Sequence, residues 1–117
     1  MKKIVFFFIG IIVTSCTSNT ILEKPKDLIP KDTMVLLLTD LFIAKSAFIE
    51  KNKQNNRKVN YMPLVYNKYK IDSTRFGSSN FYYTSKLEEY ELIYQAVNDK
   101  LLAKKAELEE VLKNKPE

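Results

Sequence analysis

The chain has 117 residues, of which 45% are hydrophobic, 28% charged and 12% aromatic, with only 2 Gly and 4 Pro. This composition excludes a disordered or low-complexity chain and limits the fold to one small domain. The net charge of +5 includes Lys2 and Lys3, and the remaining 17 basic and 14 acidic residues are too nearly balanced to indicate nucleic-acid binding. With no histidine and one cysteine, the chain lacks the commonest general base and metal ligand and any internal disulfide.

The N-terminus predicts export and lipidation. Lys2 and Lys3 precede the apolar run 4–13, whose ten residues are too few to span a bilayer but suit the apolar region of a signal peptide. Val13-Thr14-Ser15-Cys16 follows and resembles the lipobox of bacterial lipoproteins. The resemblance implies that residues 1–15 are removed and that Cys16 carries a diacylglycerol and an N-acyl chain such as palmitate. An ordinary signal peptide with an incidental cysteine is the alternative, and no other cofactor is expected.

The segment behind the cysteine predicts a tether and a location. Residues 17–29 show no hydrophobic periodicity and are punctuated by Pro25. The predicted division is therefore a signal peptide at 1–15, a lipidated N-terminus and tether at 16–29, and a helical domain at 30–117. No Asp directly follows the cysteine and no acidic cluster is present. These absences favour the periplasmic face of the outer membrane over inner-membrane retention or surface export.

Residues 30–51 predict an amphipathic helix. Pro30 and Asp32 suit its first turn, because a helix start leaves amides without partners and favours negative charge. Lys45 interrupts the apolar face, where its aliphatic stem can still pack. Apolar residues recur at spacings of three and four, and these are Met34, Leu37, Leu38, Leu41, Ala44, Phe48 and Ile49.

A basic loop and two shorter helices are expected next. Residues 51–60 are polar, with the cations Lys51, Lys53, Arg57 and Lys58. We interpret them as a solvated loop, or alternatively as a contact for anionic headgroups. Asn60 is expected to cap a short helix with Pro63 in its first turn. The apolar contacts of that helix are expected to come from Leu64, Val65, Tyr66 and Tyr69.

The second half of the chain predicts a third helix and a long fourth one. Asp72 is expected to cap the third helix, which contains Phe76, Phe81, Tyr82 and Tyr83. Ser85-Lys86-Leu87-Glu88 has the pattern of a capping box for the fourth. A heptad seam follows at Leu87, Tyr90, Tyr94, Val97, Leu101, Lys104, Leu108 and Val111. We expect Tyr94 and Val97 in the core, and Leu108 and Val111 to pack less completely.

Together these patterns predict an all-α fold, a small bundle of about four helices with a long C-terminal helix. The chain resembles the Bacteroidetes lipoprotein family catalogued as domain of unknown function 4296 (DUF4296) over about residues 25–102. The resemblance rests on several short stretches in order. They are Pro25–Pro30, Met34, Leu38-Thr39-Asp40-Leu41, Tyr66–Asp72, Phe76, Ser79, Phe81-Tyr82-Tyr83, Ile93–Val97 and Leu101. Phe42-Ile43-Ala44-Lys45 departs from the family, where a His and an acidic residue are usual.

Candidate binding residues are Asp40, Tyr82 and Tyr83. Asp40 lies at the flank of the first helix and is expected to hydrogen-bond a tyrosine such as Tyr82 or Tyr94, or to be solvated. The tyrosines either line a peptide-binding groove or belong to the core. Glutamates at 88–91 and 107–110 favour a solvated helix face over a metal site, because the metal sites of such bundles pair Glu with His. No catalytic residue and no metal ligand is predicted.

These patterns lead to a functional hypothesis without a reaction. We expect a membrane-anchored periplasmic lipoprotein that acts as a non-enzymatic interaction module and binds an envelope protein of unknown identity. The alternative is a chaperone-like binder of unfolded envelope proteins. An enzyme is disfavoured, because the sequence contains no nucleophile–base pair and no phosphate-binding pattern.

Overall fold

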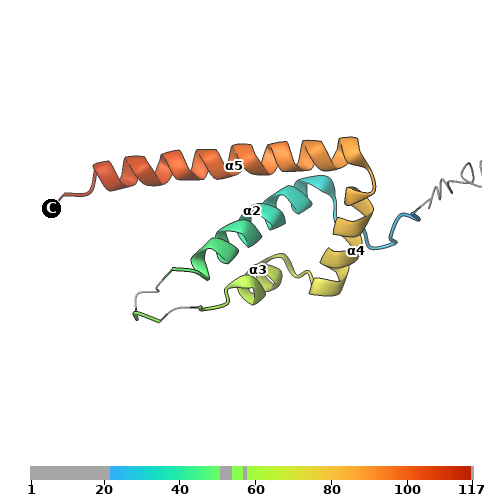
Figure 1. The fold of residues 1–117 in the computed structure, drawn as a ribbon, viewed down its shortest axis with the longest axis horizontal. Coiled ribbons are helices and arrows are strands. Elements are labelled where there is room, and N and C mark those ends of the chain that lie inside the picture. The colour runs from blue at the N-terminus through green and yellow to red at the C-terminus, as the bar shows by residue number, and fades with distance from the viewer. Residues whose placement is uncertain (1–21, 51–53, 57, 117) are drawn as a thin grey trace, which may run out of the picture.

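A computed structural model describes residues 22–50, 54–56 and 58–116. The predicted signal peptide, Cys16 and three of the four loop cations (Lys51, Lys53 and Arg57) lie outside these ranges. The described residues contain no strand and four helices, which are α2 (Lys31–Ala47), α3 (Met62–Tyr69), α4 (Ser73–Thr84) and α5 (Leu87–Lys113). In Figure 1, α2 lies between α5 and α3, and α4 closes one end of the bundle. The all-α prediction is confirmed.

Helix α2 supplies most of the core, much as its apolar stripe predicts. Five residues of that stripe are buried, namely Met34, Leu37, Leu38, Leu41 and Ala44. Phe48 and Ile49 were expected on the same face, but they are 41% and 73% exposed. Both residues lie beyond Ala47, where α2 ends, and the other described elements do not bury them.

The short helix α4 begins as predicted, whereas the N-cap position of α3 is Tyr61 rather than the predicted Asn60, and both helices bury fewer residues than expected. The Asn60 side chain accepts a hydrogen bond from the Met62 amide at 3.0 Å, and that of Asp72 accepts one from the Arg75 amide at 2.7 Å. The predicted Asp72 cap is therefore confirmed. Leu64 in α3 is 65% exposed, so its predicted packing is wrong, and Phe81 in α4 is 62% exposed. Each points away from the side of its helix that meets the core.

The predicted capping box at the start of α5 is wrong. The Ser85 hydroxyl donates to the Tyr82 carbonyl at 2.6 Å and so closes α4. It therefore does not cap α5, which begins at Leu87 after Lys86 without a side-chain cap. Leu87 is exposed, and Ile93, which was not assigned to the seam, is buried beside Val97. Tyr94 is only half-buried.

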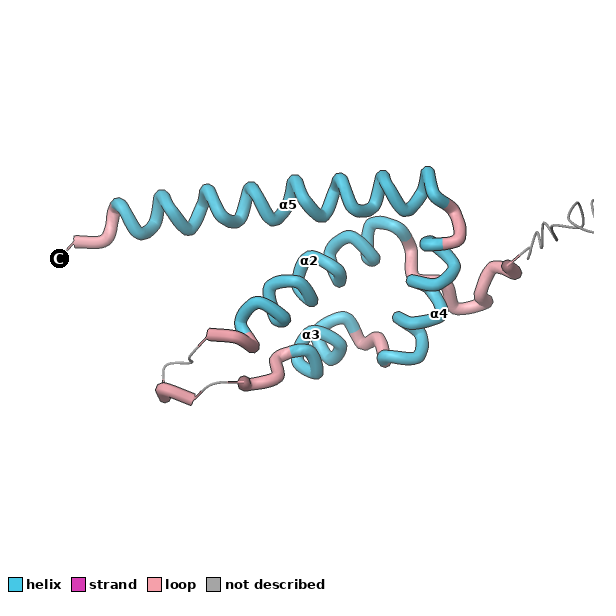
Figure 2. The backbone as a smooth tube through the Cα atoms, viewed as in Figure 1, coloured by secondary structure: helices cyan, strands magenta, loops and turns pink. Residues whose placement is uncertain are grey.

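The segment before α2 is not entirely a tether. Ile29 is fully buried, and both of its backbone groups are held by α4. Its amide donates to the Ser79 hydroxyl at 3.0 Å, and its carbonyl accepts from the Tyr83 phenol at 2.7 Å. Two residues earlier in the chain, the Asp27 carbonyl accepts a hydrogen bond from the Arg75 Nε at 2.7 Å. The domain therefore begins several residues before Pro30, as the tube in Figure 2 shows where this loop meets α4.

One apolar cluster joins these elements. It contains residues of the docked loop, α2, the α3–α4 turn, α4 and α5. Its members are Ile29, Met34, Val35, Leu37, Leu38, Leu41, Ile71, Tyr83, Ile93 and Val97. Among the residues described, no helix is both long and apolar enough to cross a membrane.

Candidate functional site

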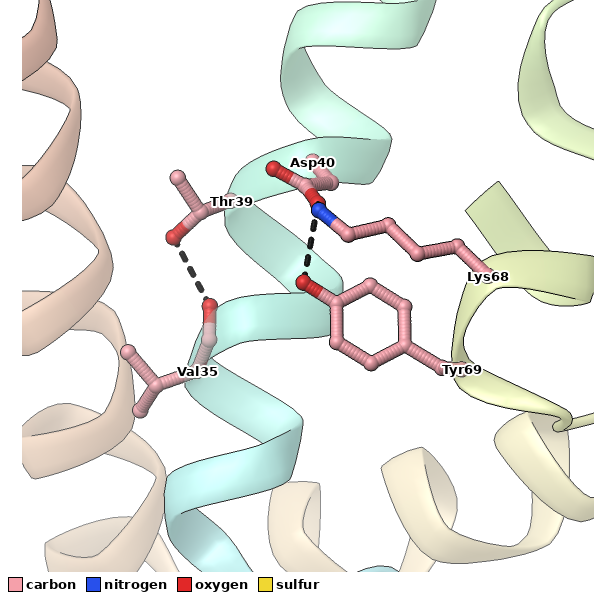
Figure 3. Close-up of polar contacts among 5 residues, drawn as sticks. All are labelled: Val35, Thr39, Asp40, Lys68 and Tyr69. Atoms are coloured by element: carbon pink, nitrogen blue, oxygen red, sulfur yellow. Dashed lines mark hydrogen bonds and ion pairs between the residues drawn. The ribbon is translucent and has the colours of Figure 1, made fainter. Parts of the chain in front are cut away.

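The most concentrated polar cluster of the described chain surrounds Asp40. This carboxylate lies on α2, where only 18% of its side chain is exposed. Its Oδ2 accepts hydrogen bonds from the Lys68 ammonium at 2.6 Å and from the Tyr69 phenol at 2.8 Å. Figure 3 shows both donors reaching from α3 across to α2. The cluster therefore ties α3 to the middle of α2.

The local sequence explains this geometry. Lys68 and Tyr69 occupy the last turn of α3, which ends at Lys70 in a left-handed conformation with φ of 52°. On α2 the neighbouring Thr39 is buried and donates to the Val35 carbonyl at 2.7 Å, so its hydroxyl is satisfied within the helix. Asp40 is thus the α2 group that faces the end of α3.

The charges of the cluster stabilise one another. Burial raises the pKa of the Asp40 carboxyl, but the hydrogen bonds from Lys68 and Tyr69 and the charges of Lys68 and Lys104 outweigh burial, so this pKa lies below its ordinary value. The hydrogen bond to Asp40 raises the pKa of Lys68. Burial and the same carboxylate raise the pKa of the Tyr69 phenol. Asp40 is therefore a weak base, which suits a structural ion pair better than proton abstraction.

A polar hollow of about 310 Å³ opens beside Asp40, between α2, α3 and α5. Its lining consists of Leu36, Thr39, Asp40, Lys68, Tyr69, Lys100, Ala103, Lys104 and Glu107. Three lysines and two carboxylates thus face one shallow space. Among the residues that the structure describes, no group of three or more metal-binding side chains gathers here or elsewhere.

An apolar groove of about 530 Å³ continues from this hollow along α5. The two share Lys104 and Glu107. Its lining consists of Ile43 from α2 and of Leu101, Lys104, Lys105, Glu107, Leu108, Glu109, Val111 and Leu112 from α5. We refer to the residues Leu101, Lys104, Lys105, Leu108, Val111 and Leu112 as the free face of α5. This face lies on the same side of the helix as the buried Val97.

The predicted binding residues do not form one site. Tyr83 is 3% exposed and serves the core through Ile29, so its role is structural. Tyr82 packs edge-on against Tyr83 at 5.7 Å between ring centroids, and Lys86 lies 5.3 Å from the Tyr82 ring centre. The predicted partner of Asp40, Tyr82 or Tyr94, is wrong, because Tyr69 holds that carboxylate.

Aromatic stacking explains the position of Tyr94. Its ring lies 4.4 Å from the ring of Tyr90 and 6.1 Å from that of Phe42, measured between centroids. Burial and the neighbouring Tyr90 phenol raise the pKa of Tyr94 to about 12. This group ties α5 to α2, and Tyr94 also borders an open hollow with Glu91, Gln95 and Asn98.

Comparison with known proteins identifies the family of this chain. Residues 25–107 match the family model described as a domain of unknown function, DUF4296. The chain belongs to this family. No curated protein and no solved structure matches it. The DUF4296 match begins at Pro25, so it includes the segment docked on α4, and it ends at Glu107, so Leu108, Val111 and Leu112 lie beyond it.

Proposed function

We propose that this DUF4296 protein is a lipid-anchored lipoprotein at the periplasmic face of the outer membrane, where it acts as a non-enzymatic interaction module. Docking takes place on the free face of α5. The observation that carries the proposal is the apolar groove of about 530 Å³ that this face forms with Ile43.

The free face of α5 continues the side of the same helix that packs against α2. On α5, Ile93 and Val97 are 3% and 2% exposed, because they lie against α2. Farther along the helix, Leu108, Val111 and Leu112 are 62%, 59% and 70% exposed. Large apolar side chains that share one helix face and gather in a groove mark a surface for another protein. In Figure 1 this part of α5 extends past the end of α2.

The polar cluster supports a binding role more than a catalytic one. Asp40 is held ionised by two donors that also fix α3 on α2. These contacts hold together the wall of the polar hollow that adjoins the groove. A rigid wall lowers the entropy lost when a partner docks.

The anchor is tested by acyl labelling of the full chain in its host or in a bacterium that processes lipoproteins. Labelled palmitate should be incorporated into the wild type and not into Cys16→Ser. The variant should also fail to fractionate with the outer membrane. Equal labelling of both chains would refute the lipoprotein assignment.

Docking is tested in cells by a photo-activated cross-linking amino acid at Leu108. The matched control carries the same amino acid at Ala106, which is exposed on the opposite side of α5. Discrete products from position 108 alone support an interaction module. A broad smear of many products would favour the chaperone-like alternative, and equal products from both positions, or none, would contradict the proposal.

A further inference from the structure

We propose that the occupant of the free face is a second copy of this chain, with the two α5 helices paired antiparallel about a two-fold axis near residue 106. This inference rests on the proposed function in that it takes the free face as the docking surface and names its partner. In the pair, Leu108, Val111 and Leu112 of one copy would pack against Ile43 and Leu101, which help to line the groove of the other copy.

The free face has the length and chemistry of a helix-pairing surface. From Leu101 to Leu112 the helix rises about 16 Å. Leu101 and Leu108 are one heptad apart, and Val111 and Leu112 follow Leu108 at spacings of three and four, a pattern by which two helices interlock. Every described residue from Leu102 onward is exposed, so the described parts of the chain leave this surface uncovered.

Charge determines the direction of pairing. Residues 98–105 carry three lysines and one aspartate, whereas residues 106–112 carry three glutamates and no cation. An antiparallel pair sets each basic segment against the acidic segment of the other copy, with Lys104 near Glu107 and Lys105 near Glu109. A parallel pair would set Lys100 against Lys105 and repel. The two lysines of the groove thus favour an acidic amphipathic segment, and residues 106–112 of a second copy supply one.

The charged side chains of this stretch are exposed and can engage a partner. Among the described residues, the one ion pair along this stretch of α5 joins Lys105 and Glu109 at 3.9 Å, and both side chains are more than half exposed. Such an exposed ion pair contributes little to stability, so its two side chains can readily form contacts with a partner instead. A patch that is complementary to itself is what a two-fold interface requires. The contact is short and therefore weak, but anchoring two copies on one membrane raises their effective concentration.

Disulfide trapping of the full chain in cells tests this geometry. One tagged copy carries Leu101→Cys and a differently tagged copy carries Val111→Cys. In the antiparallel pair these positions face each other, whereas each lies about 15 Å from its own counterpart, beyond disulfide reach. We expect a mixed disulfide between the two tags and none when either variant is expressed alone. The controls are a chain with no added cysteine, which retains Cys16, and the opposite-face pair Ala106→Cys with Glu110→Cys.

Charge reversal provides a second measurement in the same trapping background. Lys104→Glu with Lys105→Glu makes one chain acidic throughout this stretch, and Glu107→Lys with Glu109→Lys makes another basic. Four interhelical contacts change, each worth about two- to fivefold in the dissociation constant, so either reversal in both copies should lower trapping by at least about tenfold. Combining one acidic and one basic copy should restore it. These positions are exposed, so helix content by circular dichroism should stay unchanged.

Three results would overturn the inference: trapping only within each single variant, which indicates parallel pairing; trapping equal to that of the opposite-face pair; or no response to charge. If Leu108 then photo-cross-links to a different envelope protein, the second copy is ruled out while the proposed function stands. If Leu108 cross-links to nothing, the proposed function fails as well.

Discussion

The docked segment before α2 makes a sharp prediction about Ser79. Its side chain is fully buried, and its hydroxyl accepts the Ile29 amide at 3.0 Å. Ser79→Ala removes that acceptor and leaves a buried amide without a partner. An orphaned buried donor costs about 1–3 kcal/mol, so the free energy of unfolding should fall by that amount. A cavity contributes little, because only one oxygen is removed.

The adjacent serine provides a matched control. Ser78 lies on the same helix, is exposed and donates to the Arg75 carbonyl at 3.1 Å within its own turn. Ser78→Ala should change stability by less than about 0.5 kcal/mol, as exposed substitutions do. Urea denaturation followed by circular dichroism measures both variants. Equal losses, or no loss from Ser79→Ala, would refute the claim that residues 27–29 belong to the folded domain.

Three further predictions concern the core, the Asp40 cluster and the tyrosines. Val97→Ala should cost about 2–4 kcal/mol in denaturation, because Val97 is 2% exposed, whereas Leu108→Ala in a dilute monomer should cost far less. Because the pKa of Asp40 is lowered in the folded state, its contribution to stability is present above about pH 4 and is lost as the pH falls below it. In Asp40→Asn the free energy of unfolding should therefore fall less steeply as the pH is lowered below about 4. An unchanged pH dependence would contradict the ion pair. The pKa values of Tyr66, Tyr69, Tyr83 and Tyr94 are raised, so their stabilising contribution is complete below about pH 10 and is lost as the pH rises toward 12. In an alkaline titration, tyrosinate absorbance should consequently appear together with unfolding. Ionisation of all tyrosines while the chain is still folded would contradict the burial of these phenols.

The helices could be predicted because their evidence is local. The stripe from Met34 to Ala44 repeats with the helical period, and five of its residues are buried. Asp72 precedes its helix by one residue, so its capping role needs no knowledge of the rest of the fold. The same local argument failed at Ser85, where two helices compete for one hydroxyl and the preceding helix α4 holds it.

The polar contacts could not be predicted because they depend on how the helices meet. Ile29 and Ser79 are 50 residues apart, and Asp40 and Tyr69 are 29 apart. No periodicity links such positions, since the register between α2 and α3 is decided by packing. A tyrosine partner for Asp40 was predicted correctly in kind, but the choice of Tyr82 or Tyr94 was wrong.

The proposed role requires that another protein, and not the domain itself, cover the free face of α5. Amide hydrogen exchange along α5 tests this directly, because protection reports how often each stretch opens. The full chain should be compared in native membranes and at high dilution in detergent. We expect residues 93–97 to be protected in both, and residues 102–113 to be protected in membranes and to exchange quickly on dilution. Equal protection of 102–113 in both conditions, or rapid exchange in both, would contradict the account.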